Sequence, residues 1–451
     1  MQRVAIIGAG ATGLAAAYDL ARQGIGVDLY EAGAEVGGLA AGFKDERWEW
    51  TLEKFYHHWF ASDDAILGLI AELGAQDRVL FPRPTTSLWL NGKVYPMDRP
   101  NIVVANLRLP LSWPAKIRYG VTGLYLRLTR NWRPLEKVTA ERWLQRAMGR
   151  EAYETLWRSL LIGKFGTYYD QVNMAWMWAR IYKRTPRLGT FVGGFQAFLE
   201  LLAEHVQQHG GRVHLNSSVR QIERRADGKL SVQVQGQVEE FDAVINTTSP
   251  QAMLRLAPQL EGAYAEKLRS LQSMGAVVVI FALKHQLLRD GTYWLSLPAS
   301  QPDKRNSEFP FLALVEHTNY MDAQHYGGDH LVYCGDYVVP DHEYLRLDEQ
   351  ELAARFQRVL SRFNTAFDST WVRKWWVFRT PYAQPVPLVN HSQRLPDLRT
   401  PIPGLYFASM SQVYPWDRGT NYAVEMGRDV AALVLRDLAG GGVTGGSVGK
   451  A

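Results

Sequence analysis

Residues 3–31 read RVAIIGAGATGLAAAYDLARQGIGVDLYE, and this stretch decides the fold. It opens at 3–7 with a short apolar run rich in β-branched residues, which is typical of a strand buried on both faces. A Gly-x-Gly-x-x-Gly turn at 8–13 leads into an alanine-rich helical stretch that ends near Gln23, and a second strand ends at Glu31. The order of strand, glycine turn, helix, strand and acid predicts a dinucleotide-binding β-α-β unit.

Each glycine of the turn has its own physical reason. Gly8 permits the tight turn, Gly10 lets a pyrophosphate approach the backbone, and Gly13 lets the helix pack closely on the strand. The helix N-terminus supplies oriented N–H groups and a positive dipole to the phosphates. Glu31 stands where a carboxylate accepts both ribose hydroxyls and repels a 2′-phosphate, which argues against NADP at this site.

A second glycine pair, Gly37-Gly38, follows Glu31 and precedes Leu39, and it lets the backbone approach an extended ligand again. This arrangement resembles the FAD-binding superfamily of amine oxidases, protoporphyrinogen oxidase, phytoene-type desaturases and UDP-galactopyranose mutase, in which such a pair runs beside the flavin. The resemblance implies FAD as the cofactor, with Gly37, Gly38 and Leu39 among the residues that contact it.

Three later blocks resemble the same families in the same order along the chain. The block at 193–222 begins with GGFQAF and contains Val219, whose backbone the resemblance places against the adenine. The blocks at 242–248 and 403–408 resemble the following strand and the last strand under the flavin. The resemblance therefore extends over nearly the full length of the chain.

We accordingly predict an α/β protein with a Rossmann-type FAD-binding domain (GR2-like), an antiparallel-sheet substrate domain and a helical insert. An Asn91-Gly92 turn between alternating residues predicts a hairpin at the start of the insert. Strand-like runs after residue 275 predict the sheet. The expected boundaries are 1–85, 190–250 and 390–438 for the discontinuous FAD-binding domain, 86–189 for the helical insert, 251–389 for the substrate-binding sheet domain and 439–451 for a disordered glycine-rich tail.

Two adjacent histidines are the first catalytic candidates. Residues 53–60, EKFYHHWF, follow a strand-like piece at 48–52, where the resemblance places residues over the flavin ring. His57 or His58 could orient a substrate or move protons there. The alternative is a histidine that is hydrogen-bonded in the interior for packing alone.

The C-terminal region supplies further candidates. Residues 379–387 resemble a Tyr-rich, Pro-rich turn of the mutases and contain Tyr382, and the segment that leads into the last helix contains Arg418. We expect both residues to be catalytic. The resemblance implies that the helix N-terminus lies beneath the flavin pyrimidine and stabilises negative charge on the reduced ring; the alternative is an ordinary helix packed on the sheet. The cofactor-binding candidates in this region are Ser409, Thr420, Asn421 and Tyr422.

Composition excludes several other classes of protein. A single cysteine, Cys334, excludes a disulfide framework and a cysteine-cluster metal site. The 50 Lys and Arg against 45 Asp and Glu give a net charge of +5, a weak argument for nucleic acid, and we expect none as a partner. His205 and His209 lie four apart on a predicted helix without a third ligand nearby, so we expect no metal. The 15 Trp, 21 Tyr and 17 Phe indicate a large apolar site.

Residues 101–133 hold six basic side chains and no acid, with apolar residues at helical spacing. A basic amphipathic helix of this kind can lie in an anionic membrane interface. Two alternatives stay open: a helix packed on its own domain with a solvated basic face, and a site for an anionic sugar nucleotide. No stretch approaches the roughly 20 uncharged apolar residues of a membrane span, and no targeting peptide is visible. We expect a cytoplasmic location, with peripheral contact at the inner membrane face.

The leading functional hypothesis is an FAD-dependent oxidoreductase that takes hydride from a C–H or C–N bond of a bulky, largely apolar small molecule. The alternative is an isomerase similar to UDP-galactopyranose mutase, which would use reduced flavin on a nucleotide sugar. A third hypothesis is a flavin-binding protein without a catalytic role. The sequence leaves the substrate, the electron acceptor and the oligomeric state open.

Overall fold

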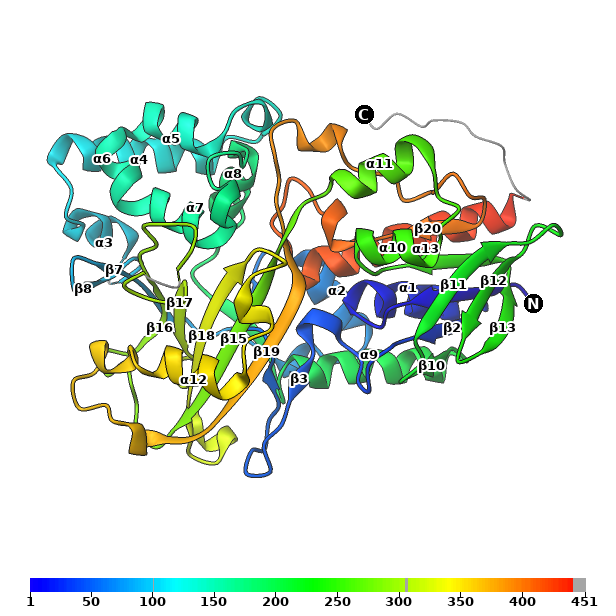
Figure 1. Cartoon of the computed structure of the whole chain (residues 1–451), viewed down its shortest axis with the longest axis horizontal. Coiled ribbons are helices and arrows are strands. Elements are labelled where there is room, and N and C mark those ends of the chain that lie inside the picture. The colour runs from blue at the N-terminus through cyan, green and yellow to red at the C-terminus, as the bar shows by residue number, and fades with distance from the viewer. Residues whose placement is uncertain (100, 305–306, 441–451) are drawn as a thin grey trace.

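The computed structural model describes residues 1–99, 101–304 and 307–440. Figure 1 shows two bodies side by side: an α/β body that carries both the N-terminus and the last helix, and a body built on a large twisted sheet with a helical layer above it. The expected glycine-rich tail at 439–451 lies, from residue 441 onward, outside the described residues.

The α/β body is built on a parallel sheet of five strands in the order β10-β2-β1-β14-β20. Every neighbouring pair in this sheet is parallel, and a helix joins the first two strands, as the β-α-β pattern predicts. The strands come from three distant parts of the chain: β1 (Arg3–Ile7) and β2 (Gly26–Tyr30), then β10 (Arg212–His214) and β14 (Ala243–Asn246), and finally β20 (Leu405–Phe407).

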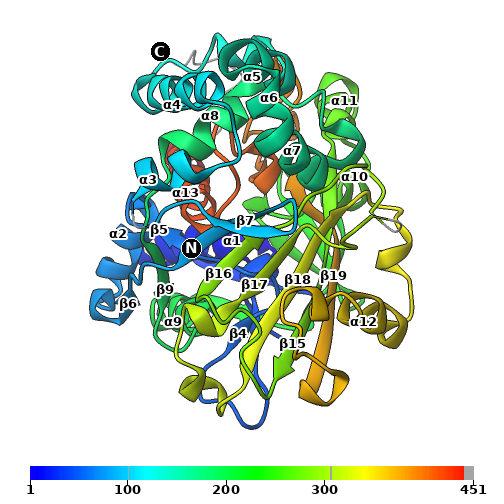
Figure 2. The ribbon, with the colours of Figure 1, turned by 90° about the vertical axis from the view of Figure 1, so that its left-hand side faces the viewer.

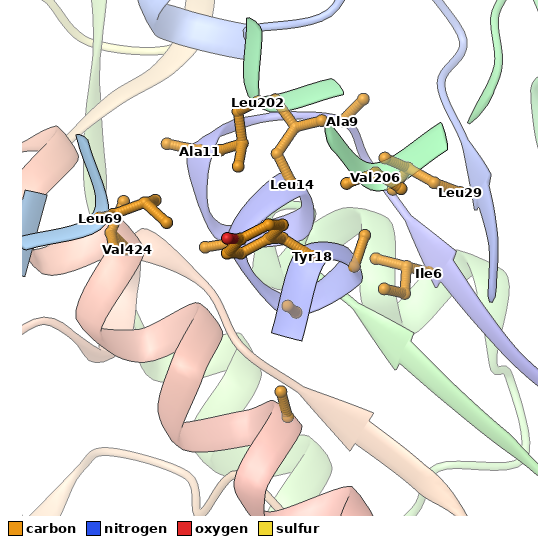
Figure 3. Close-up of a cluster of buried hydrophobic side chains, with 14 of the residues drawn as sticks. Ile6, Ala9, Ala11, Leu14, Tyr18, Leu29, Leu69, Leu202, Val206 and Val424 are labelled. Atoms are coloured by element: carbon orange, nitrogen blue, oxygen red, sulfur yellow. The ribbon is translucent and has the colours of Figure 1, made fainter. Parts of the chain in front are cut away.

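Helices cover one face of this sheet, and Figure 3 shows the core that they share with it. Tyr18 of the first helix lies among side chains from β1 and from the other helices of this layer. A Cβ at Gly427 would lie 2.4 Å from the Thr12 carbonyl oxygen, so the first and last helices pack almost backbone to backbone. The helices are α1 (Ala11–Arg22), α2 (Asp64–Glu72), α9 (Phe195–Gln208) and α13 (Thr420–Ala439).

A three-stranded antiparallel sheet and two short helices cover the opposite face. Ala5 and Ile7 of β1 pack there against Ile222 and Leu230, so β1 is buried on both sides, as its composition predicts. These elements are β11 (Val219–Arg224), β12 (Leu230–Val234), β13 (Gln237–Phe241), α10 (Pro250–Leu256) and α11 (Gly262–Ser270).

The second body is built on a seven-stranded sheet in the order β19-β15-β18-β17-β16-β7-β8. The predicted antiparallel sheet is confirmed for β15 to β19, whose neighbouring pairs are all antiparallel, but β7 also joins it and pairs with β16 in parallel. The hairpin at 85–96, expected in the helical insert, joins this sheet because its first strand satisfies the free backbone edge of β16. The strands are β7 (Thr85–Leu90), β8 (Lys93–Pro96), β15 (Ser273–Leu283), β16 (Thr292–Ser296), β17 (Ala313–Glu316), β18 (His330–Val338) and β19 (Val372–Pro385).

A helical layer covers one end of this sheet (Figure 2). Its core is rich in aromatic side chains, among them the fully buried Trp176, Trp178, Tyr153 and Phe165. The layer consists of α3 (Ile102–Arg108), α4 (Trp113–Leu128), α5 (Ala140–Met148), α6 (Arg150–Ala152), α7 (Arg158–Phe165) and α8 (Met174–Tyr182). On the far side of the sheet, α12 (Glu349–Gln357) packs on β19 and β15. Among the described helices, none is long and apolar enough to cross a bilayer.

Short strands connect the two bodies, and here a second expectation is corrected. The strand expected at 48–52 is reduced to β4 (Leu52–Glu53), which pairs with β3 (Gly42–Phe43). The amides of Glu49 and Trp50 instead donate to the His325 carbonyl oxygen, at 2.9 and 3.2 Å, so a loop takes the place of a strand partner. The other short strands are β5 (Trp59–Phe60), β6 (Val79–Leu80) and β9 (Leu188–Phe191).

Candidate active site

The glycine turn lies between β1 and α1, and steric contacts exclude side chains from it. A Cβ at Gly13 would lie 1.9 Å from the Gly8 carbonyl oxygen, which a backbone atom cannot avoid without a shift of the turn. Gly8 itself has a φ of +100° and would bring a Cβ within 2.7 Å of the Thr247 Oγ1. The first amides of α1 therefore face a turn whose surface is bare backbone.

The second glycine pair packs directly on this turn. Gly10 and Gly37 form a parallel β-bridge, and the Gly37 amide donates to the Ala9 carbonyl oxygen at 2.8 Å. A Cβ at Gly38 would lie 3.4 Å from the Gly10 Cα, where φ at Gly38 is also positive, +56°. The two glycine segments thus form one cradle of exposed backbone, and a cradle that side chains would fill fits the pyrophosphate of a dinucleotide.

Glu31 is held in place at the end of β2 by the same cradle. Its Oε2 accepts from the Ala9 amide at 2.9 Å, and its Oε1 accepts from the Gly33 amide at 2.8 Å. A carboxylate has about four acceptor positions, so each oxygen keeps capacity for a hydroxyl donor. The Ser217 amide donates to the Glu31 carbonyl oxygen at 2.7 Å, which brings the start of β11, Val219, next to this acid. The predicted cofactor residues of the N-terminal half and Val219 therefore lie together.

A small pocket lies where the two bodies meet. It opens between the residue that follows the second glycine pair, the segment after β4, three strands of the large sheet and the loop before α13. Its lining residues are Leu39, Phe55, Tyr56, His57, Ala276, Asp336, Tyr337, Ala383 and Arg418. Three residues that were predicted from the sequence, Leu39, His57 and Arg418, are thus brought together.

The two adjacent histidines have different surroundings. The His57 Nδ1 lies 2.5 Å from the Phe55 carbonyl oxygen. A carbonyl oxygen only accepts, so Nδ1 carries the proton and Nε2 is left as an acceptor. Burial, with a contribution from the Arg418 charge, lowers the pKa of His57 to about 4. Burial lowers the pKa of His58 to about 3, and its Nδ1 has no hydrogen-bond partner among the described residues. His58 packs edge-on against Phe60 and is not among the described residues that line the pocket.

Arg418 presents a positive charge to the pocket. Its Nε donates to the Gln384 Oε1 at 3.0 Å, and its Nη2 donates to the Tyr337 hydroxyl. Among the described residues, no carboxylate forms an ion pair with this guanidinium. The side chain is therefore held by two neutral groups, and the charge of Asp417 lies near it without forming an ion pair.

The neighbouring Asp417 forms ion pairs with two further cations. Its Oδ2 accepts from the Lys164 Nζ at 3.0 Å and from the Arg180 Nη1 at 2.6 Å, and its Oδ1 accepts from the Trp176 indole at 3.0 Å. Burial alone would raise the pKa of Asp417, but the Lys164 and Arg180 charges outweigh it and hold this pKa well below its usual range. Burial and the Arg180 charge lower the pKa of Lys164 to about 7. Lys164, Arg180 and Arg418 thus surround one carboxylate, and the region carries excess positive charge.

A buried ion pair completes the polar wall of the pocket. Asp336 of β18 pairs with Lys304, and both side chains are almost fully buried. Burial raises the pKa of Asp336 to about 6, although the Lys304 charge opposes this shift. Because this acid has its own cation, it does not balance Arg418.

Tyr382 lies outside the pocket and joins two elements. Its hydroxyl lies 2.8 Å from the Ser409 Oγ and 2.7 Å from the Ser411 Oγ, and it accepts from the Ser411 amide at 3.1 Å. These bonds tie β19 to the loop that follows β20. Among the described residues that line the pocket, Tyr382 and Ser409 are missing, and only the next residue on β19, Ala383, contributes.

The candidates at the start of α13 use their side chains within the protein. The Thr420 Oγ1 accepts from the Trp59 indole at 2.8 Å, and the Asn421 Oδ1 accepts from the Ile66 amide at 3.1 Å. Tyr422 stacks on Trp416 with ring centroids 5.8 Å apart. The helix begins after Gly419 without a side-chain cap, so the first-turn amides are the groups of this segment that remain for a cofactor.

Sequence reasoning missed most of the pocket's polar residues. Asp336 could have been identified from the sequence, because it is an acid inside an otherwise apolar strand. Lys164 and Arg180, which lie beside the pocket and not in its lining, could not be predicted, since they are on separate helices and reach Asp417 only in the folded chain.

Comparisons with known proteins agree with the fold. The family model described as flavin containing amine oxidoreductase matches residues 11–435. The chain is 26% identical over 310 residues to 15-cis-phytoene desaturase of Synechococcus elongatus, a match that covers 61% of this chain and 64% of that protein. It is 26% identical to 15-cis-phytoene desaturase of Arabidopsis thaliana, of which 53% is covered. The chain thus spans roughly half to two thirds of these curated relatives.

Solved structures share the fold over the whole chain at low identity. A putative protoporphyrinogen oxidase from Exiguobacterium sp. 255-15 superposes with a TM-score of 0.75 at 18% identity, covering 96% of this chain and 99% of that one. A reduced UDP-galactopyranose mutase superposes with a TM-score of 0.73 at 16% identity, covering 97% and 96%. The predicted resemblance, the α/β fold and the flavin cofactor are confirmed, and the chain belongs to the flavin containing amine oxidoreductase family.

Proposed function

We propose that this protein removes hydride from a C–H or C–N bond of a bulky, largely apolar small molecule bound in the pocket between the two bodies. The observation that carries the proposal is the position of this pocket, which begins at Leu39, directly after the glycine cradle. Phe55, Ala276 and Ala383 give it apolar walls. Apolar walls exclude water from the reacting bond.

We assign the cofactor site to the glycine cradle, Glu31, the start of β11 and the first turn of α13. Bare backbone at Gly8, Gly10 and Gly13 would take the pyrophosphate, and Glu31 would accept the ribose hydroxyls. When bound, FAD supplies the two-electron acceptor. The chain's own residues bind it, orient the substrate and exclude water.

Two pocket residues have proposed roles toward the substrate. His57 is neutral near pH 7, because its pKa is about 4, and its Nε2 offers an acceptor that orients a substrate N–H or O–H group. Arg418 is a cation without a carboxylate partner among the described residues, and it offsets the negative charge that hydride transfer brings into the site. Tyr337 and Gln384 hold its guanidinium in place.

The isomerase alternative is not favoured. The solved mutase is similar in fold at 16% identity, whereas the family model and the curated relatives are oxidoreductases and desaturases. We also propose that the protein works at a membrane surface, because a largely apolar substrate partitions into bilayers rather than water.

Anaerobic flavin reduction tests the proposal. The FAD-loaded protein is mixed with a panel drawn from the substrates in its relatives' names: 15-cis-phytoene, coproporphyrinogen III and cyclohexylamine. Bleaching of the visible flavin absorbance by an apolar member of the panel supports hydride removal. Turnover of a nucleotide sugar only after prior reduction, without net bleaching, would establish the isomerase instead. A fully loaded protein that does neither contradicts any catalytic function of this kind.

A further inference from the structure

The exposed apolar side chains of this protein gather on two consecutive helices. Twelve large apolar side chains are exposed among the described residues, and nine of them lie on α3 and α4. Figures 1 and 2 place these helices at the outer edge of the helical layer. We call the nine residues the α3–α4 face: Ile102, Val103, Leu107, Trp113, Ile117, Val121, Leu124, Tyr125 and Leu128, with exposed fractions from 46% to 69%.

The α4 helix has two apolar sides, and only one of them is buried. Ala115, Thr122 and Leu126 are buried and face the protein. At 3.6 residues per turn, the six residues of the α3–α4 face that lie on α4, from Trp113 to Leu128, form a stripe about 120° wide on the opposite side. A surface helix normally carries polar residues on its solvent side. The second apolar stripe is therefore not needed for packing within this chain.

The charges around the stripe are basic. Residues 101–133 contain six Lys and Arg and no acid. Three of the six serve the fold: Lys116 donates to the Leu107 carbonyl oxygen at 2.8 Å, and Arg118 and Arg127 likewise donate to main-chain carbonyl oxygens of neighbouring helices. The other three are exposed: Arg108 at the last position of α3, and Arg130 and Arg133 beyond the end of α4.

One acid on the facing helix α6, Glu151, is already engaged. The Glu151 carboxylate accepts from the Ser112 amide and hydroxyl, both at 2.5 Å, at the N-terminus of α4. A basic border around an exposed apolar stripe with a tryptophan at one end fits an anionic lipid surface, where apolar side chains enter the acyl boundary and cations stay among the headgroups. A second copy fits poorly, because a two-fold contact would bring the same cations together.

We infer that the α3–α4 face docks the protein on an anionic bilayer, with α4 lying in the plane of the interface. The inference rests on the proposed function, because docking would give the protein access to a substrate dissolved in the bilayer. The path inward is short: α4 packs on α8, and Arg180 and Trp176 of α8 reach Asp417 beside the pocket residue Arg418.

Vesicle flotation of the full-length, FAD-loaded protein tests the inference. Vesicles of phosphatidylcholine alone are compared with vesicles that contain phosphatidylglycerol. We expect flotation with the anionic vesicles, weakened by salt, because surface charges are screened within a Debye length of about 10 Å at 0.1 M. Wild-type protein that stays unbound at low salt with anionic vesicles would overturn the inference.

Matched variants test whether the apolar stripe itself is responsible for vesicle binding. The double variant Val121→Glu with Leu124→Glu should lower vesicle binding at least about tenfold, since charged side chains are excluded from the acyl boundary. Val238→Glu is the control, because Val238 is 58% exposed on β13, a part of the molecule far along the chain from α4. It should bind like the wild type. Equal flotation of the double variant and the wild type contradicts docking through this face.

Two further measurements keep the outcome unambiguous. The flavin absorbance of the double variant reports folding and cofactor binding, so its loss of flotation with unchanged absorbance supports the inference. Size-exclusion chromatography without lipid reports self-association, and a dimer that the double variant abolishes would reassign the face to a second copy. Failure of anaerobic flavin bleaching would refute the proposed function and leave the flotation result standing.

Discussion

The glycine cradle and the pocket are both parts of one site, yet they are built on opposite principles. The cradle depends on what its residues lack, because a Cβ at Gly13 or Gly37 would meet backbone atoms at 1.9 and 2.9 Å. The pocket depends on what its residues carry, since Arg418 and the cations around Asp417 come from separate elements and supply charge. Substitutions in the cradle should therefore weaken FAD binding. Substitutions in the pocket should leave FAD bound and change stability or chemistry instead.

The largest effect is expected for Gly13→Ala. The new Cβ would lie 1.9 Å from the Gly8 carbonyl oxygen, so the turn must shift. Overpacking costs up to about 3 kcal/mol, and a contact with backbone this close falls at the upper end, which corresponds to roughly a hundredfold loss of FAD affinity. Flavin content per chain, measured after denaturation, reports the loss.

Gly68→Ala is the matched control for this variant. Nothing lies within 4 Å of a Cβ at Gly68 in the middle of α2, so alanine should stabilise that helix by about 0.5–1 kcal/mol and leave the flavin content unchanged. A Gly13→Ala protein that is as yellow as the wild type would contradict the steric account of the cradle.

Asp417→Asn should have the next largest effect, on stability. The change leaves Lys164 and Arg180 without their carboxylate. Unpairing buried cations costs about 3–5 kcal/mol, and the partial exposure of this cluster reduces the expected loss to about 2–3 kcal/mol. The midpoint of urea unfolding of the FAD-loaded protein measures it.

Glu351→Gln gives the comparison with an exposed pair. It breaks the ion pair with Arg355, where the Glu351 side chain is 56% exposed, and should cost at most about 0.5 kcal/mol. Equal losses in the two variants would mean that the Asp417 cluster is no more buried in solution than an ordinary surface pair.

The two principles also explain how far sequence reasoning reaches. The β1–α1–β2 unit follows from residues close together in the chain, so glycine spacing and one acid were sufficient to predict it. The parallel pairing of β7 with β16 joins residues about 200 positions apart, and no local pattern encodes it. The same holds for the adjacent histidines: an irregular segment follows β4, so no period of two or 3.6 could tell which of His57 and His58 faces the pocket.

Arg418→Met should retain the cofactor and slow its reduction about tenfold. Methionine keeps an apolar stem of similar length but removes the charge that faces the pocket. Loss of that charge should also lower the two-electron midpoint potential of the bound flavin. The expected shift is about 30 mV for each tenfold decrease in the equilibrium constant of flavin reduction. Stopped-flow bleaching and a redox titration measure the two effects.

Arg418→Lys is the control for this charge. It should recover most of the potential, though not the hydrogen bond to Gln384, because lysine lacks the planar fork of arginine. An unchanged potential in Arg418→Met would remove the charge of Arg418 from the proposed chemistry.

The smallest effect concerns Glu53, which connects the two regions. Its Oε1 accepts from the Phe195 amide at the start of α9, at 2.8 Å, and its carbonyl oxygen accepts from the Tyr333 hydroxyl of β18, at 2.8 Å. Burial raises the pKa of Glu53 to about 7, from an ordinary value of 4.5, although the Phe195 amide opposes the shift. Between these two values the folded chain holds a proton that the unfolded chain has released.

The free energy of unfolding should therefore fall as the pH rises from about 4.5 to about 7 and stay level above it. At 1.36 kcal/mol per unit the shift sets an upper limit of about 3 kcal/mol, and we expect about 1–2 kcal/mol. Glu53→Gln keeps an acceptor for the Phe195 amide without a charge to bury, so it should gain stability relative to the wild type between pH 5 and pH 8. The same substitution at the exposed Glu46 should leave the difference flat. A constant difference between Glu53→Gln and the wild type across this range would mean that water reaches Glu53, and that the junction between the cradle and the pocket is open rather than packed.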